Sequence, residues 1–152
     1  MKRVFLSLIV ALMLGPAILA TAQAQSVSDV LKSFRKLEAD TEAGMNHGEY
    51  IRGLAEVNAQ LKNYSDATQG KPPSPAIQAL RAAFDSYLSG KALWDQQRLQ
   101  DMRYENSEVS IKQYFDEKAA NSEAISRLWE KAGGEIDRAA SLVNATPRTK
   151  TR

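Results

Sequence analysis

Apolar residues recur at steps of three and four positions along most of the chain, which is the spacing of one face of an α-helix. The first such stripe consists of Val27, Val30, Leu31, Phe34, Leu37 and Thr41. Gly44 follows it, and glycine readily adopts the left-handed conformation that closes a helix. We therefore expect a first helix from about Ser26 to Gly44.

A second stripe predicts a helix over residues 47–64. Its apolar positions are Tyr50, Leu54, Val57, Leu61 and Tyr64. Asn46 stands just before it and Glu49 follows three residues later, a spacing typical of a capping box. The polar stretch 65–73 contains a glycine and a pair of prolines, so it predicts a loop.

The third stripe begins after Ser74 and Pro75. This pair favours a helix start, because serine accepts hydrogen bonds from unpaired amides and proline needs no amide partner in the first turn. The apolar positions are Ala76, Ile77, Leu80, Ala83, Phe84, Tyr87, Leu88, Trp94, Leu99 and Met102. We expect this helix to reach about Tyr104 despite Gly90, with a break at residues 105–107.

The fourth stripe is the longest. Its apolar positions are Ile111, Phe115, Ile125, Trp129, Ala132, Ile136, Ala139 and Val143. Lys118 and Ser122 interrupt it and are expected to weaken the apolar seam locally. The Gly133–Gly134 pair is expected to kink the helix.

The helical pattern sets the fold class. No stretch alternates apolar and polar residues with the period of two that strands show, so we expect an all-α fold. Four amphipathic helices with short links predict an antiparallel bundle in a single domain over residues 25–145.

The predicted helices differ in length. At 1.5 Å per residue the first two reach about 27 Å, whereas the last two exceed about 40 Å and overhang the shorter pair. The overhang contains Leu99, Met102, Val109 and Ile111. Self-association, binding of a partner, or breakage into shorter helices would each account for it, and we favour breakage.

The first 24 residues have the anatomy of a secretory signal peptide. Lys2 and Arg3 give a charged start, an apolar run covers residues 4–14, and small side chains lead to a cleavage site ending at Ala24. A membrane anchor is the alternative, but it needs roughly 20 apolar residues, and a Gly-Pro pair interrupts this run. We expect cleavage near Ala24 and a periplasmic or secreted bacterial protein.

The balance of charged side chains limits the classes of partner that the sequence predicts. Removal of the signal peptide leaves 18 basic and 18 acidic side chains, and the chain has no cysteine. Three of the bases, Arg148, Lys150 and Arg152, belong to residues 146–152, which we expect to form a flexible basic tail. The folded part is then slightly acidic, whereas nucleic-acid binding needs a clustered basic face. We therefore expect no nucleic-acid partner. Because the chain has no second long apolar run, we also expect no membrane span.

His47 is the single histidine and lies in the predicted turn between the first two helices. Zinc sites generally combine several histidine or cysteine ligands, and helical di-iron sites use Glu-x-x-His on two helices. The sequence therefore predicts no metal site and no cofactor, with His47 as a turn residue. A b-type haem between His47 and Met102 stays open, since Met45 is too near His47 in sequence to face it.

Neighbouring carboxylates occur at Glu38 with Glu42 and at Asp116 with Glu117. Paired carboxylates can act as acid and base when a cleft pushes their acidities apart. Both pairs lie off the apolar stripes, so we expect them at the exterior without a catalytic role. No Gly-x-Ser-x-Gly turn and no glycine-rich phosphate loop occurs, so an enzyme is not predicted.

Two stretches carry a resemblance. LEADTEAGMNHGEYIRGLAEVNAQLKNY (residues 37–64) and ISRLWEKAGGEIDRAASLV (residues 125–143) resemble small exported bacterial helical proteins of uncharacterised function. The resemblance rests on helix patterns and one turn. It implies a periplasmic or secreted location and carries no catalytic residue.

These features favour an exported, non-enzymatic helical bundle that binds another envelope protein, scaffolds an envelope assembly or self-associates. Leu99 and Met102, at surplus apolar positions, are the candidate partner surface. The alternative is a small-ligand carrier or sensor with an aromatic pocket near Tyr50, Tyr87 and Trp94. Packing in the core also accounts for these aromatic residues.

Overall fold

The computed structural model describes residues 26–104 and 110–145 of the 152-residue chain. These residues form four helices and no strand: α1 (Val27–Glu42), α2 (His47–Ala67), α3 (Pro75–Tyr104) and α4 (Ile111–Ala145). The predicted signal peptide, the break at 105–107, Val109 and the basic tail at 146–152 lie outside the described residues.

The helix starts follow from local hydrogen bonding. At α2 the Asn46 side chain accepts from the Glu49 amide, and the Glu49 carboxylate accepts from the Asn46 amide, which confirms the predicted capping box. Ser26 and Asp29 form the same reciprocal arrangement at α1. Gly44 has a φ of +86° just after the last turn of α1, as its predicted closing role requires.

The predicted start of α3 is confirmed, while the preceding loop is shorter than expected. The Ser74 hydroxyl accepts from the Ile77 amide at 3.3 Å. α2 continues to Ala67, three residues beyond its predicted end. Side-chain contacts hold this extra turn, because Lys62 pairs with Asp66 at 2.7 Å and Arg81 of α3 donates to Ser65 at 3.0 Å.

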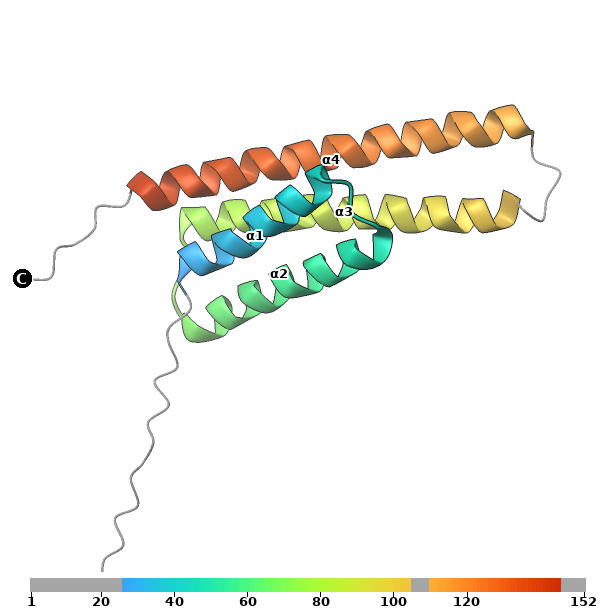
Figure 1. Ribbon diagram of the computed structural model, residues 1–152. Helices are drawn as coiled ribbons and strands as arrows, with labels where there is room; N and C mark the ends of the chain where they lie inside the picture. The colour runs from blue at the N-terminus through green and yellow to red at the C-terminus, as the bar shows by residue number, and fades with distance from the viewer. Residues whose placement is uncertain (1–25, 105–109, 146–152) are drawn as a thin grey trace, which may run out of the picture.

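The helices pack as an antiparallel bundle, which confirms the predicted fold (Figure 1). Polar contacts also join these helices: Lys36 of α1 binds Glu56 of α2 at 2.8 Å, and Arg35 of α1 binds Asp137 of α4 at 2.6 Å. α1 packs against all three other helices. Within the described helices, no segment has both the length and the apolar character needed to cross a membrane.

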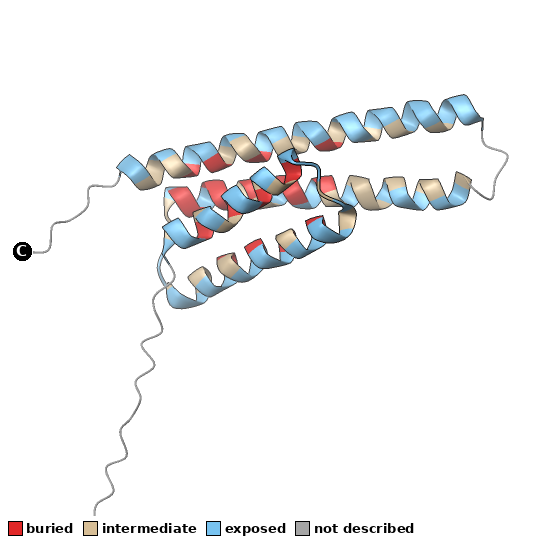
Figure 2. Cartoon of the chain, viewed as in Figure 1, coloured by how far each residue is buried: buried red, intermediate tan, exposed pale blue. Residues whose placement is uncertain are grey.

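Burial is concentrated where all four helices overlap. Figure 2 shows the buried residues on the part of α3 and α4 that α1 and α2 cover. The largest side chains that are completely enclosed are Tyr50, Tyr87, Phe34, Leu37, Ile77, Leu80, Ile136, Val30 and Val57. In α3 the last buried residue is Gly90, and in α4 the first is Ile125.

The expectation that the long helices are broken is wrong. α3 runs unbroken through Gly90 for 30 residues, and α4 runs through Gly133–Gly134 for 35 residues. These lengths correspond to about 45 and 52 Å, against about 24 and 32 Å for α1 and α2. The two long helices therefore project past the α1–α2 turn (Figure 1). We call residues 97–104 of α3 with 111–121 of α4 the arm, and the four-helix part the body.

Candidate functional site

An aromatic cluster lies in the body where it meets the arm. The Tyr50 hydroxyl donates to the Tyr87 backbone carbonyl at 2.8 Å and accepts from the Trp129 indole N–H at 2.9 Å. The Tyr50 ring lies 5.5 Å from that of Trp94 and 5.4 Å from that of Trp129, between ring centroids. The cluster thus joins α2, α3 and α4 through one buried phenol.

Gly90 makes this close packing possible. A Cβ atom at this position would lie 3.1 Å from Nε1 of Trp129 and 3.4 Å from the Tyr50 hydroxyl oxygen. The contact with Nε1 is tighter than in most packed structures, so a side chain here would push against the indole nitrogen that donates to Tyr50. Burial raises the pKa of Tyr50, which therefore stays a neutral phenol able to donate.

The structure separates the predicted site residues into two groups. Tyr50, Tyr87 and Trp94 come together, but Tyr50 and Tyr87 have no exposed surface and belong to the core. Trp94 is half-buried and lines a small pocket. Leu99 and Met102 lie on the arm and are more than half exposed. Trp129 is not among the predicted site residues, yet it lines two of the cavities described below. Its position on the fourth stripe indicates only that it faces other helices.

His47 is more than a turn residue. It is the first residue of α2, and its side chain is 13 % exposed. Nε2 lies 2.6 Å from the Asp95 carboxylate, and Nδ1 lies 2.8 Å from the Arg98 guanidinium. Because a guanidinium only donates, Nδ1 accepts, and Nε2 carries the proton that binds Asp95. The His47 and Trp94 rings form a T-shaped pair with centroids 5.4 Å apart.

These contacts join the start of α2 to α3 next to the arm. Both ring nitrogens of His47 are engaged, so neither is free to ligate haem iron opposite Met102. Asp95 also accepts from Lys91 at 2.5 Å, and Lys91 foremost, then His47, lower the pKa of the carboxyl. Across residues 26–104 and 110–145, no group of three histidine or carboxylate side chains is placed to hold a metal ion.

The arm is polar along the seam between its two helices. Asp101 of α3 accepts from the Tyr114 hydroxyl at 2.5 Å and from Lys118 at 3.3 Å. Asn121 donates to Gln100 at 3.2 Å. The rings of Tyr104 and Tyr114 stack with centroids 4.3 Å apart. Hydrogen bonds and one aromatic stack therefore join α3 to α4 here, in place of the buried aliphatic side chains of the body.

Large apolar side chains lie on the outside of the same segment. Leu99 is 54 % exposed, Met102 55 %, Ile111 64 % and Phe115 61 %. The usual distribution of polar and apolar residues is thus inverted in the arm. Isolated exposed apolar residues are common, but several on one short projection are typical of an interaction surface.

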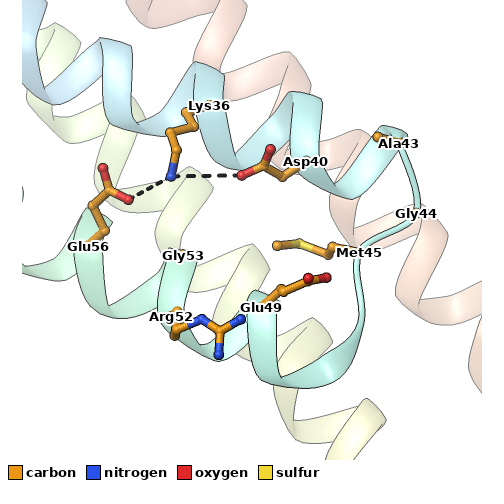
Figure 3. A pocket seen from close by; sticks show the side chains of 9 residues that line it. All are labelled: Lys36, Asp40, Ala43, Gly44, Met45, Glu49, Arg52, Gly53 and Glu56. Carbon is orange, nitrogen blue, oxygen red and sulfur yellow. Dashed lines mark hydrogen bonds and ion pairs between the residues drawn. The ribbon is translucent and has the colours of Figure 1, made fainter.

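One cavity of about 420 Å³ lies between α1 and α2 near their turn. Figure 3 shows the Lys36 ammonium bridging Glu56 and Asp40 across it, at 2.8 and 3.9 Å. Glu49 and Arg52 also line it, so acidic and basic groups face each other inside the cavity. The charges of this pocket are largely satisfied by one another.

A second cavity differs from the first because its charged lining residues are all acidic. A groove of about 600 Å³ runs between α1 and α4. Its lining consists of Glu38, Thr41, Glu42, Ser126, Trp129, Glu130, Gly133, Gly134 and Asp137. The prediction of a fully exterior carboxylate pair is therefore wrong for Glu38, whose side chain is 18 % exposed because α4 covers it. Glu42, Asp116 and Glu117 are exposed as predicted.

A smaller pocket of about 270 Å³ adjoins the groove. Its lining consists of Trp94, Gln97, Ser122, Ile125, Ser126 and Trp129. Ser126 and Trp129 line both spaces, so one side of α4 contributes to both. We call the two together the Trp129 groove.

The chain matches no protein-family model, no curated protein and no solved structure. The resemblance to small exported helical proteins stays a prediction from the sequence.

Proposed function

We propose that this protein is an exported, non-enzymatic helical module that binds another protein through its arm. One observation carries the proposal: the arm has a polar seam between its helices and exposes four large apolar side chains. Burial of such side chains by a partner is favourable by roughly 25 cal/mol per Å² of apolar surface.

The exposed residues lie on the side of α3 and α4 that α1 and α2 cover in the body. On α3, Leu99 comes one turn after Asp95 and Met102 one turn after Arg98, and both preceding residues contact His47 of α2. On α4, Phe115 shares a helix face with Gly133, which lies against Glu38 of α1.

The helix layer formed by α1 and α2 thus stops at their turn while the apolar positions beneath it continue. A helical segment of another protein would extend this layer along the arm. Ridges of Leu99, Met102 and Phe115 would then enter the grooves of the incoming helix. The polar seam fixes the spacing of α3 and α4 on which such a helix would rest.

Export is part of the proposal and rests on the sequence of residues 1–24. The intact mass of the protein recovered from the periplasm of its host tests it. We expect a chain that begins at Gln25, and a mass that includes the first 24 residues would contradict export with cleavage at this site.

Site-specific photo-crosslinking in the host cell tests the binding surface. A benzophenone side chain at Phe115 would lie within the proposed interface. The same probe at Leu88, which is 42 % exposed on α3 in the body, serves as the matched control. We expect a discrete adduct with a different protein from position 115 and none from position 88.

A second substitution makes the result specific. Met102→Lys places a charge within the proposed interface, and we expect it to remove the adduct while leaving the folded body unchanged, since Met102 is more than half exposed. An adduct that forms equally from position 88, an adduct of the protein with itself alone, or no adduct from position 115 would each overturn the proposal.

A further inference from the structure

The Trp129 groove carries a charge that the protein does not fully neutralise. Four carboxylates line its larger part, from Glu38, Glu42, Glu130 and Asp137, and that lining contains no basic side chain. Arg35 reaches two of the four from outside, with 2.7 Å to Glu38 and 2.6 Å to Asp137. In the part of the chain that the structure describes, no basic side chain pairs with Glu42 or Glu130.

Two glycines in the α4 wall help to keep this space open. A Cβ atom on Gly133 would lie 2.9 Å from the Glu38 carboxylate oxygen, so a side chain there would displace that carboxylate. Gly134 meets nothing within 4 Å, which shows open space beside it. The carboxylates and the cavity therefore depend on the same short stretch of α4.

The unpaired carboxylates lie beside the aromatic pocket. Glu130 follows Trp129 directly, and Glu42 is the last residue of α1. Trp94, Ile125 and Trp129 give the smaller pocket an apolar lining. An indole face attracts a cation by about 0.5–2 kcal/mol, depending on how far the cation is desolvated. Negative charge and an aromatic surface thus adjoin one another.

A buried tyrosine lies next to the α1 residues that line the groove. The side chain of Tyr87 extends from α3 toward Glu38, Thr41 and Glu42, the α1 residues that line the groove. Its hydroxyl is fully buried and forms no well-aligned hydrogen bond with the described residues, although Thr41 lies close enough to lower its pKa. Burial chiefly, and then the charge of Glu38, raise its pKa, so it remains a neutral donor and acceptor.

We propose that the Trp129 groove binds a small organic cation that carries an apolar group. The ammonium would lie between Glu42 and Glu130, and the apolar group would occupy the pocket formed by Trp94, Ile125 and Trp129. A bare metal ion fits less well, since in the described helices no three acidic or histidine side chains converge on one point. This inference is independent of partner binding by the arm.

Intrinsic fluorescence tests the site directly, because the only two tryptophans of the chain both line the pocket. The mature protein is titrated with hexylammonium, and with hexan-1-ol as a neutral molecule of similar length. We expect a saturable change in fluorescence with hexylammonium and binding at least about tenfold weaker for the alcohol.

Charge variants provide the matched control. Glu42→Gln combined with Glu130→Gln is expected to weaken hexylammonium binding about tenfold or more. Asp40→Asn combined with Glu56→Gln removes the same charge from the other pocket and is expected to leave binding unchanged. All four side chains lie at or near the surface, so each variant should fold.

The inference is overturned by a non-saturable response, by equal affinity for the alcohol, or by equal loss in both double variants. Met102→Lys separates it from the proposed function, because this change is expected to abolish crosslinking at the arm and leave the titration unaltered.

Discussion

The body and the arm use the same two helices in opposite ways. In the body, α3 and α4 meet through small and aliphatic residues such as Ala83, Ala132 and Ile136, all fully buried. In the arm they meet through hydrogen bonds among Asp101, Tyr114 and their neighbours. Regular helices are thus present in both parts, although only one has an apolar core.

This contrast indicates which part of the protein supplies most of the free energy of folding. Burial of apolar side chains supplies most of the free energy of folding, whereas exposed polar pairs contribute little. The body is therefore expected to fold without help. The arm is held by its continuity with the body and by a few polar contacts, and four of its large apolar side chains are more than half exposed.

The largest expected effect compares one substitution at two positions of α4. Ile136→Ala removes a completely buried side chain and is expected to lower the free energy of unfolding by about 2–5 kcal/mol. Ile111→Ala, at a position that is 64 % exposed, is expected to change it by less than about 0.5 kcal/mol. Urea denaturation of both variants measures this, and similar losses would contradict the division into body and arm.

A smaller effect is expected at the phenol that joins three helices. Tyr50→Phe leaves the Trp129 indole N–H and the Tyr87 carbonyl without their shared partner. We expect a loss of about 1–3 kcal/mol, the usual cost of unpaired buried polar groups. Thermal unfolding monitored by circular dichroism gives the value. An unchanged melting temperature would show that this hydrogen-bonded joint contributes nothing to the body.

In the arm, Tyr114→Phe removes the hydrogen bond to Asp101 while retaining the ring that stacks on Tyr104. We expect global stability to fall by less than about 1 kcal/mol, because the residue is half-buried and its partner is solvated. The same urea denaturation measures it. A loss as large as that of Ile136→Ala would mean that the seam supports the whole fold.

The smallest expected effect depends on pH, at the cluster that joins the start of α2 to α3. The pKa of Asp95 is lowered from 3.8, so the stability that its carboxylate contributes is present above that value and lost as the pH falls through the folded-state pKa. Asp95→Asn is therefore expected to lower stability at pH 7 by less than about 1 kcal/mol, since the side chain is 38 % exposed. A difference from wild type that grows on acidification would contradict this assignment.

The bundle was predictable because its signals are local. Hydrophobic spacing gave the four helices, and Asn46 with Glu49 gave the start of α2. The partners of His47 were not predictable, because Asp95 and Arg98 lie 48 and 51 residues away and become neighbours only when α2 packs on α3.

The arm shows a second limit of the sequence. Lys118 interrupts the apolar stripe and was expected only to weaken it, yet it donates across the seam to Asp101 of α3, and also to Tyr114 one turn earlier in α4. Periodicity shows which face of a helix is apolar. It does not show whether another helix covers that face, and in the described helices Leu99, Ile111 and Phe115 of the arm are more than half exposed. The partial burial of Glu38 was not predictable for the same reason, because it depends on the packing of α4 against α1.

Amide hydrogen exchange along α3 and α4 of the isolated mature protein tests the central claim most directly. In one experiment it compares residues 79–90 and 125–139 of the body with residues 100–104 and 114–121 of the arm. We predict protection in the body close to that set by global unfolding, and protection in the arm lower by about a hundredfold or more. Uniform protection along both helices would contradict the claim, because the arm would then be stable by itself and its apolar surface would need no partner.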